Sequence, residues 1–241
     1  MSRTIRRAVM TAALVVPAAL FAQKPTAQAL FDKHAAAVGG VPAFRAVSSR
    51  TESGTADITF VGMTAGYERK VSAGKMLMII DIAGFGQVQQ GFDGTIAWAI
   101  DPRSGASRMD PGMTAEVMSS TVPTAGLWET GSYASAEVLE MADFGGTKAW
   151  PVKIVGKSGR TRTVYYDQAT GFKVGEVIQQ PSGEQKTQYA DYKRFGTITI
   201  PTKVTQGTPN GNIVLNTTAV TFDVIAPSTF VLPDAVKLLP Q

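Results

Sequence analysis

Apolar and polar residues alternate along most of the chain with the period of two that is typical of β-strands. Residues 87–105 show this pattern clearly. Asp93-Gly94 is a hairpin-turn signal, because a type I′ turn needs positive φ at both central residues. The strand after the turn places Trp98 and Ile100 on one face, since strand side chains alternate between faces. The stretch therefore predicts a β-hairpin with an apolar return strand.

The same alternation recurs through the chain, and each run ends in its own turn residues. Further strands are predicted at residues 55–61, 66–72, 76–82, 136–141, 149–155, 162–166, 173–180, 186–194, 197–207 and 213–224. Strands at this spacing predict an antiparallel meander. A flat sheet of this width would expose its apolar face. We therefore expect a mainly β fold, with a single strongly curved antiparallel sheet or incomplete β-barrel of about 10–11 strands.

Two segments depart from the alternation. Residues 27–46 carry apolar residues at helical spacing, and Gly39-Gly40 is a signal for the end of a helix. Residues 109–128 contain Pro111 at a helix start. We expect a short helix in each segment, and we expect the second segment to lie over one face or mouth of the sheet.

The N-terminus has the anatomy of an export signal. Arg3, Arg6 and Arg7 form a basic region, and residues 8–22 carry no charge. This apolar run is shorter than the roughly 20 residues that a membrane-spanning helix needs. We therefore predict that residues 1–22 are a signal peptide, or an N-terminal anchor if they are retained.

Composition agrees with one globular domain after this segment. The 241 residues are 44% hydrophobic and 17% charged, and residues 23–241 show no linker or shift in composition, which predicts a single β domain. The formal net charge of +4 includes three N-terminal arginines, so the remainder carries +1. This small charge gives no reason to expect a nucleic-acid partner. The chain has no cysteine, which excludes disulfides, cysteine-ligated zinc, Fe–S clusters and an acylated N-terminal cysteine.

Residues suited to catalysis are scarce. The single histidine, His34, is a candidate general base or metal ligand, but the absence of cysteine and of a second base favours a solvent-facing helix residue. Ser72 and Lys75 match the S-x-x-K pattern of penicillin-recognising enzymes without its companion motifs. The aspartates fall mostly at predicted turns, and a glycosidase-like carboxylate pair among them is the alternative. We therefore predict no enzymatic activity, no cofactor and no metal.

Apolar residues of the first strands are the candidate binding residues. Methionine is unbranched and polarizable, so it suits a surface that accepts variable apolar shapes. An ordinary filled core is the alternative interpretation. The candidate lining residues of an apolar cavity are Ile58, Phe60, Met76, Met78, Ile80, Phe85, Trp98 and Ile100.

Five groups of short motifs follow one another along the chain. They are Val38-Gly39-Gly40, Gly91-Phe92-Asp93-Gly94 with Ala97-Trp98, Tyr166-Asp167 with Thr170-Gly171-Phe172, Asp191-Tyr192 with Gly196 and Ile200-Pro201, and Phe230-Val231-Leu232-Pro233. As an ordered set they resemble the LolA/LolB-like superfamily of periplasmic lipoprotein carriers, the outer-membrane lipoprotein-sorting proteins. The resemblance implies an incomplete β-barrel around a short helical lid, with a cavity for acyl chains between them. The helix near residues 29–38 and the insertion near residues 113–122 would then be the lid.

Two functions of different class follow. The first is an exported binding protein of the bacterial periplasm that holds acyl chains of lipids or lipoproteins. The alternative is a structural or accessory subunit on the periplasmic face of a respiratory or photosynthetic membrane complex, associated with the inner membrane through an uncleaved N-terminal segment. A native protein that begins at Gln23 in mass spectrometry favours the first. A start at Met1 or Ser2, with co-purifying membrane subunits, favours the second.

Overall fold

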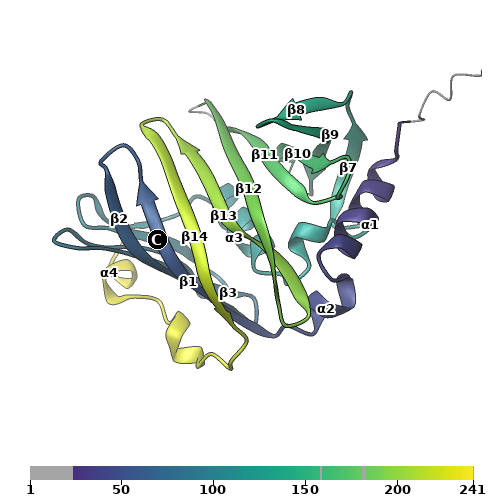
Figure 1. Cartoon of the computed structure of the whole chain (residues 1–241). Helices are drawn as coiled ribbons and strands as arrows, with labels where there is room; N and C mark the ends of the chain where they lie inside the picture. Colours follow the sequence, from purple (N-terminus) through teal and green to yellow (C-terminus); the bar gives the residue numbers. More distant parts are fainter. Residues whose placement is uncertain (1–23, 158, 181–182, 241) are drawn as a thin grey trace, which may run out of the picture.

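The fold is built from two antiparallel meanders that share one sheet (Figure 1). The computed structural model describes residues 24–157, 159–180 and 183–240. The first meander comprises β1 (Ser49–Ile58), β2 (Met63–Ser72), β3 (Lys75–Ile82), β4 (Gly86–Phe92), β5 (Ala97–Asp101) and β6 (Gly105–Arg108). The second comprises β7 (Tyr133–Val138), β8 (Ala142–Phe144), β9 (Thr147–Gly156), β10 (Thr161–Asp167), β11 (Lys173–Gln180), β12 (Gly183–Phe195), β13 (Ile198–Thr208) and β14 (Gly211–Thr221).

The strand order is β6-β5-β4-β3-β2-β1-β14-β13-β12-β11-β10-β9-β7, and β8 also pairs with β9. The pairing of β1 with β14 therefore joins the two meanders. The edge strands β6 and β7 do not pair with each other among the described residues, so the sheet is curved but open. The predicted mainly β, incompletely closed antiparallel sheet is confirmed. Its 14 described strands exceed the expected number, partly because β6 and β8 are too short to show an alternating pattern.

The chain between the two edges contains the predicted insertion. α3 (Pro111–Ser120) is followed by the 3₁₀ helix η1 (Ala125–Leu127), and together they connect β6 to β7. Asp110 caps α3 by accepting a hydrogen bond of 2.8 Å from the backbone N–H of Met113, and a proline follows at the first helical position. The helix predicted within residues 109–128 is thus confirmed.

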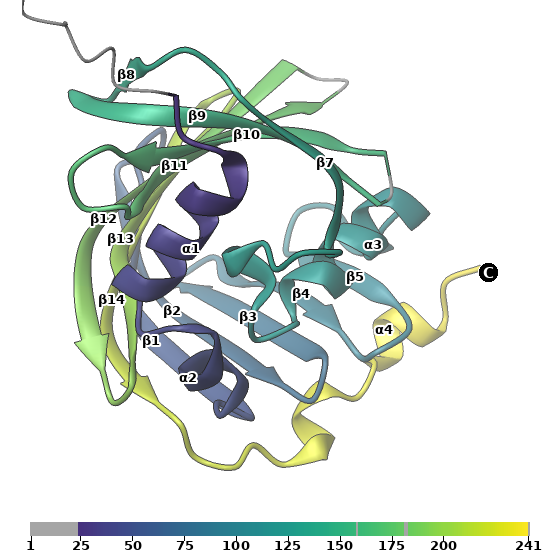
Figure 2. The ribbon, with the colours of Figure 1, turned by 90° about the vertical axis from the view of Figure 1, so that its right-hand side faces the viewer.

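α1 (Ala27–Ala37) and α2 (Val41–Arg45) lie on the concave side of the sheet, against the second meander (Figure 2). α1 ends before Gly39-Gly40 as predicted. Gly39 has a φ of 116°, and a Cβ there would lie 2.4 Å from the carbonyl oxygen of Thr197. The backbone N–H of Thr199 also donates to the carbonyl of Val38 at 2.8 Å. The close approach that glycine permits therefore fixes the end of α1 to the start of β13.

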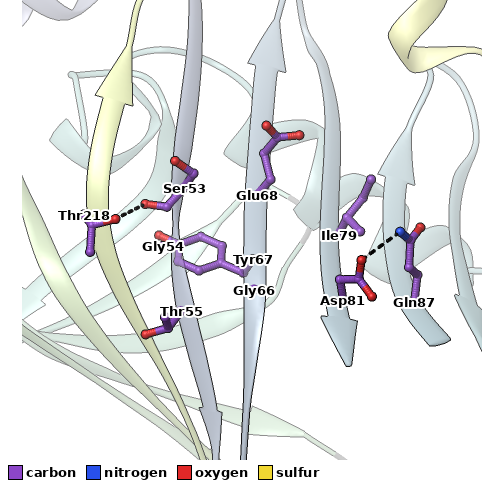
Figure 3. Close-up of a pocket in the computed structure, with 10 residues that line it drawn as sticks. All are labelled: Ser53, Gly54, Thr55, Gly66, Tyr67, Glu68, Ile79, Asp81, Gln87 and Thr218. Atoms are coloured by element: carbon purple, nitrogen blue, oxygen red, sulfur yellow. Dashed lines mark hydrogen bonds between the residues drawn. The ribbon is translucent and has the colours of Figure 1, made fainter. Parts of the chain in front are cut away.

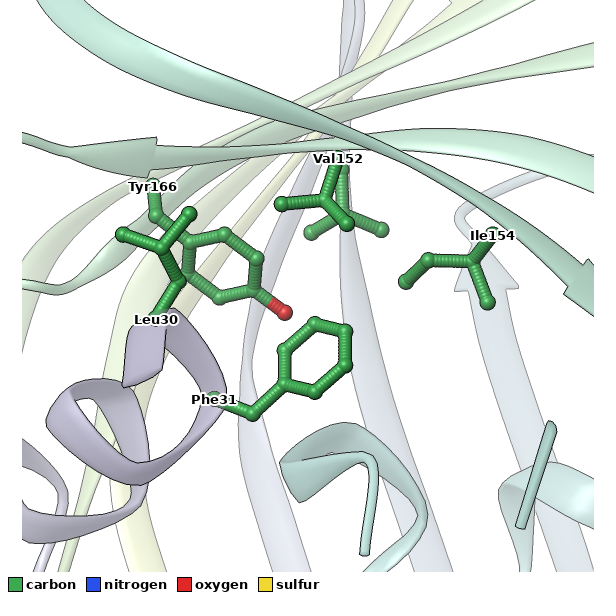
Figure 4. Close-up of a cluster of buried hydrophobic side chains, with 6 residues drawn as sticks. Leu30, Phe31, Val152, Ile154 and Tyr166 are labelled. Carbon is green, nitrogen blue, oxygen red and sulfur yellow. The ribbon is translucent and has the colours of Figure 1, made fainter. Parts of the chain in front are cut away.

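A buried cluster anchors α1 to β9 and β10 (Figure 4). Its members are Leu30, Phe31, Val152, Ile154, Val164 and Tyr166. The Phe31 ring meets the rings of Tyr133 and Tyr166 edge-on, with centroids 5.5 and 5.9 Å apart. A second cluster links α1 and α2 to β13 and η1; it comprises Ala35, Val38, Phe44, Leu127, Ile198 and Ile200. Since each buried Leu or Phe side chain contributes about 1.5–3 kcal/mol, these clusters form the main core of the second meander.

The hairpin around Asp93 forms with a longer turn than the sequence predicts. Residues 93–96 connect β4 to β5. Gly94 has a φ of 104°, whereas Asp93 is not among the residues with positive φ. The Asp93 carboxylate instead accepts hydrogen bonds of 2.8 Å from the backbone N–H groups of Thr95 and Ile96. The type I′ prediction was therefore wrong, because the aspartate stabilises the turn through its side chain.

Part of the convex side of the first meander is covered by the C-terminal segment, which contains η2 (Pro227–Phe230) and α4 (Asp234–Lys237). Arg108 of β6 donates to the carbonyl of Val236 at 3.4 Å, and Phe230 and Val236 are buried. Trp98 pairs with Arg108 and so lies on the same face of the sheet. Its ring rests on Gly91, where a Cβ would lie 2.3 Å from ring atom Cζ2.

No helix in the described ranges has the length and apolarity to cross a membrane. The predicted signal peptide or anchor at residues 1–22 lies outside those ranges.

His34 is buried, so the predicted solvent-facing position was wrong. Its Nδ1 lies 3.1 Å from the carbonyl oxygen of Gly171, and its ring centroid lies 5.4 Å from that of Tyr166. Burial, with the charge of Lys173, lowers the pKa of His34 from 6.5 to about 4. The neutral ring therefore joins α1 to the turn before β11.

We expect Trp98→Ala to lower the free energy of unfolding by about 3–5 kcal/mol, because the substitution removes a buried aromatic ring. Gly91→Ala should also destabilise, since its methyl group would meet the same ring. The exposed Val224 supplies a control, and Val224→Ala should have little effect. Chemical denaturation measures all three variants, and an unchanged midpoint for Trp98→Ala would show that the ring does not support the fold.

We expect acid to destabilise the protein partly through His34. The unfolded chain binds the proton with a pKa near 6.5, and the folded chain with a pKa of about 4. The stability that neutral His34 contributes is thus complete above pH 6.5 and is lost progressively toward pH 4. The free energy of unfolding should fall by about 2 kcal/mol from pH 7 to pH 5 through this group. His34→Gln should reduce that decrease, and an identical pH dependence in the two proteins would contradict this assignment.

Candidate functional site

The concave face of the first meander presents an apolar wall. Directly paired residues in antiparallel strands lie on the same face, and Met76 pairs with Phe92. Met78 and Ile80 follow Met76 at intervals of two along β3, so they lie on that face as well. Ile58 packs in the same buried cluster as Ile80. Four of the candidate lining residues are therefore on one face, and their contact with a ligand stays a prediction.

Trp98 and Ile100 lie on the opposite, convex face. Phe92 pairs with Ala97, so the concave face of β5 carries Ala97 and Ala99 instead. The placement of both larger residues with the concave-face candidates was therefore wrong. Alternation separates the two faces of a strand, but it does not identify the inner one where both faces are covered.

Phe60 and Phe85 lie in hairpin turns, where their exposed fractions are 44% and 40%. Phe60 follows the end of β1, and Phe85 follows the end of β3. Arg103 lies over the Phe85 ring, with its Cζ 4.6 Å from the ring centroid. These two side chains are at the rim of the sheet, so the structure does not bring them to the apolar wall.

α3 covers part of the wall. Met109, just before α3, and Val117 within it pack against the buried cluster of Met76, Phe92 and Ala97. α3 has no buried residue of its own. α3 therefore has few of the buried apolar contacts that hold a core helix in place.

Two arginines of the second meander hold α3 across the opening of the sheet. Glu116 accepts a hydrogen bond of 2.7 Å from Nη1 of Arg160 and one of 2.6 Å from Nη2 of Arg162. Arg162 belongs to β10, and Arg160 directly precedes that strand. These hydrogen bonds thus connect α3, which follows edge strand β6, to β10 near the opposite edge of the sheet.

Arg162 also faces a buried charged group on β11. Its Nη1 lies 3.9 Å from Oε2 of Glu176, and Nζ of Lys173 lies 3.6 Å from the same oxygen. Burial alone would raise the pKa of Glu176, but Lys173, Arg162 and a hydrogen bond from Tyr189 hold this pKa below its usual range. Burial raises the pKa of Tyr189 well above its usual value. Glu176 is therefore an ionised, fully paired carboxylate.

A second charged group lies on β1 and β2. Glu52 pairs directly with Arg69 across the two strands, and Arg50 lies two residues before Glu52. Nε of Arg50 is 2.7 Å from Oε1 of Glu52, and Nη1 of Arg69 is 3.4 Å from the same oxygen. Burial lowers the pKa of Arg50, and Glu52 opposes this effect. Arg69 pairs with Met78 of β3, so the group adjoins the apolar wall.

These charged residues were missed by the sequence reasoning, although a signal exists. Arg69 lies in phase with the apolar residues Tyr67 and Val71 along β2, and Glu176 lies in phase with Ile178 along β11. A charge at an inward-facing position of an alternating strand is unusual, because burial of a charge is costly unless it is paired.

The convex face carries a polar groove of about 520 Å³ (Figure 3). Its lining comprises Ser53, Gly54, Thr55, Gly66, Tyr67, Glu68, Ile79, Asp81, Gln87 and Thr218. The Asp81 carboxylate accepts a hydrogen bond of 3.3 Å from the Gln87 amide across this groove. A smaller hollow of about 270 Å³ includes Ser49 and Phe222. None of the eight candidate residues lines either space.

The described ranges contain no group of three or more histidine, cysteine or acidic residues that could hold a metal ion. Ser72 and Lys75 flank the β2–β3 turn, in which Ala73 and Gly74 have φ values of 49° and 75°. The S-x-x-K match is thus a tight hairpin turn, and its serine and lysine are strand ends.

No family model matches the sequence, and no curated protein matches it. Solved structures do share its architecture. A LolA superfamily protein from Nitrosomonas europaea superposes with a TM-score of 0.57 and 13% identity, over 86% of this chain and 98% of that one. A domain from Vibrio parahaemolyticus described as outer membrane lipoprotein-sorting gives a TM-score of 0.56 and 12% identity, over 84% and 95% of the two chains. A DUF1329 family protein from Desulfovibrio piger gives a TM-score of 0.52 and 11% identity, over 84% and 96%. The resemblance predicted from the sequence motifs is confirmed at the level of the fold: the chain has the fold of LolA superfamily proteins.

Proposed function

We propose that this protein binds the acyl chains of a lipid or lipoprotein on the concave face of the first meander, without catalysis. The observation that carries the proposal is the apolar wall of Met76, Met78 and Ile80, part of which α3 covers. The solved structures of similar fold include a domain described as lipoprotein-sorting, which supports a ligand of this class.

α3 acts as the lid in this proposal. The second meander is filled by buried side chains of α1, whereas α3 buries none of its residues. Movement of α3 would break the contacts of Glu116 with two arginines and would uncover Met76 and Phe92. Segments held by few buried contacts open at low free energy. An acyl chain would then replace the apolar contacts that α3 gives up.

The export signal predicted from the sequence supports the same function. The basic and apolar N-terminal segment fits a protein of the bacterial periplasm, where acyl chains must be kept out of water between membranes. Acyl chains gain about 0.8 kcal/mol per buried CH₂, so a wall that covers part of the chain provides useful affinity.

A second candidate is an accessory subunit on the periplasmic face of a membrane complex, tethered by residues 1–22. The apolar side chains that the C-terminal segment leaves exposed favour it. They are Val224, Val231 and Leu238. Such residues suit a protein partner, and co-purification of membrane subunits with native protein would separate this candidate from a free carrier.

Titration with a fluorescent acyl probe tests the binding proposal. We expect saturable binding at micromolar concentration to the chain that begins at Gln23. Met78→Asn should weaken binding about tenfold, because an unpaired amide against an acyl chain costs about 1–3 kcal/mol. The neighbouring Ile79 faces the convex groove, so Ile79→Asn is the matched control and should leave affinity nearly unchanged. Equal losses in both variants, or no binding by the parent protein, would contradict the proposal.

Glu116→Gln tests the lid. Loss of the carboxylate weakens its charge-assisted hydrogen bonds to Arg160 and Arg162. We expect several-fold faster probe association in stopped-flow measurements, and faster proteolysis within residues 109–132. Glu137→Gln on the exposed side of β7 is the control. Association rates that are the same in Glu116→Gln, Glu137→Gln and the parent protein would show that α3 does not limit entry.

A further inference from the structure

The positive and negative charges in the group formed by the second meander and by α3 with its N-cap residue are equal in number. Three cations face three carboxylates, and each carboxylate lies within 4.0 Å of at least one cation. The cations are Arg160, Arg162 and Lys173, and the carboxylates are Asp110, Glu116 and Glu176. This group carries no net charge and needs no further partner.

The charges of the group on β1 and β2 do not cancel, because it contains two arginines and one glutamate. Arg50 and Arg69 both contact the same oxygen of Glu52. In the described part of the chain, neither arginine forms an ion pair with a second carboxylate. The side chains of Arg50, Glu52 and Arg69 are only 20%, 14% and 24% exposed. One positive charge is therefore left over in a largely buried position, where an unpaired charge is costly.

The excess charge adjoins the proposed acyl site. Arg69 pairs with Met78 in the β2–β3 register, and Val71, opposite Arg50, pairs with Met76. Arg69 thus lies beside Met78, and Arg50 lies one strand further away, across Val71 from Met76, on the same face of the sheet. A ligand whose chain covers those methionines would bring its head group within reach of Arg69.

We infer that the acyl ligand is an anionic amphiphile whose carboxylate or phosphate head group binds Arg69 and Arg50. This inference rests on the acyl-binding function proposed above and adds the charge of the ligand. Guanidinium groups suit this role, because their planar fork of donors matches carboxylate and phosphate oxygens. The head group would supply the second negative charge that Glu52 alone does not provide.

Ligands that share one chain and differ in their head groups test the inference. We would measure binding of palmitate, hexadecyl phosphate and hexadecanol by the chain that begins at Gln23, below their critical micelle concentrations. At least one anionic ligand should bind tenfold or more tightly than hexadecanol, and the preference should shrink at high salt. The tighter of the two anionic ligands identifies the head group.

Two variants on neighbouring positions of β2 complete the test. Arg69→Met should reduce the preference for the anionic ligand to less than about threefold while hexadecanol binds as before. Lys70 lies on the opposite face and forms a salt bridge with Glu68. Lys70→Gln should therefore keep the full preference for the anionic ligand. If Arg69→Met does not fold, the comparison of palmitate, hexadecyl phosphate and hexadecanol with the parent protein still tests whether an anionic head group is preferred. Equal affinities for acid, phosphate and alcohol would overturn the head-group inference and leave acyl binding intact, whereas no binding of any ligand would overturn the proposed function itself.

Discussion

The 14-stranded sheet of the described residues cannot cover its own concave apolar surface. The packing of α1 covers the part of this surface that belongs to the second meander. Phe31 enters a ring of aromatic and branched side chains from β9 and β10. The contact at Gly39 sets how closely the helix approaches β13. The helix occupies the hollow of the second meander only, so the apolar residues of the first meander are covered by other segments, α3 among them.

The two halves consequently differ in what they can do. Beneath α1 the side chains are buried and the charges are paired, so that half is a folded core. Beneath α3 the cover is a helix with no buried residue, and the neighbouring arginines Arg50 and Arg69 exceed their single carboxylate. Buried apolar residues beneath a cover that is itself without buried residues, next to a group with an excess positive charge, offer a ligand contacts that the free protein does not make.

Much of this architecture could be predicted from the sequence, because alternation and turn residues are local properties. The strands, the end of α1 before Gly39 and the insertion after β6 are of this kind. The inward face of β5 is not, since the buried Trp98 lies on the convex face together with Arg108, which contacts the distant C-terminal segment. The burial of His34 and the pairing of Glu116 with Arg162 depend on residues far along the chain. Local periodicity contains no information about such partners.

The pairing that joins the two meanders also has a consequence for how the chain is made. Ile58 of β1 pairs with Ile213 of β14, and these strands are the first and the last of the sheet in the described part of the chain. Contacts of such high sequence separation form slowly, because a long loop must close first. During synthesis β1 therefore keeps an open edge until β14 has been made, and an open edge can pair with other chains. The protection of β1 from pairing with other chains therefore depends on the last strand of the sheet, and a chain truncated before β14 would leave that edge open.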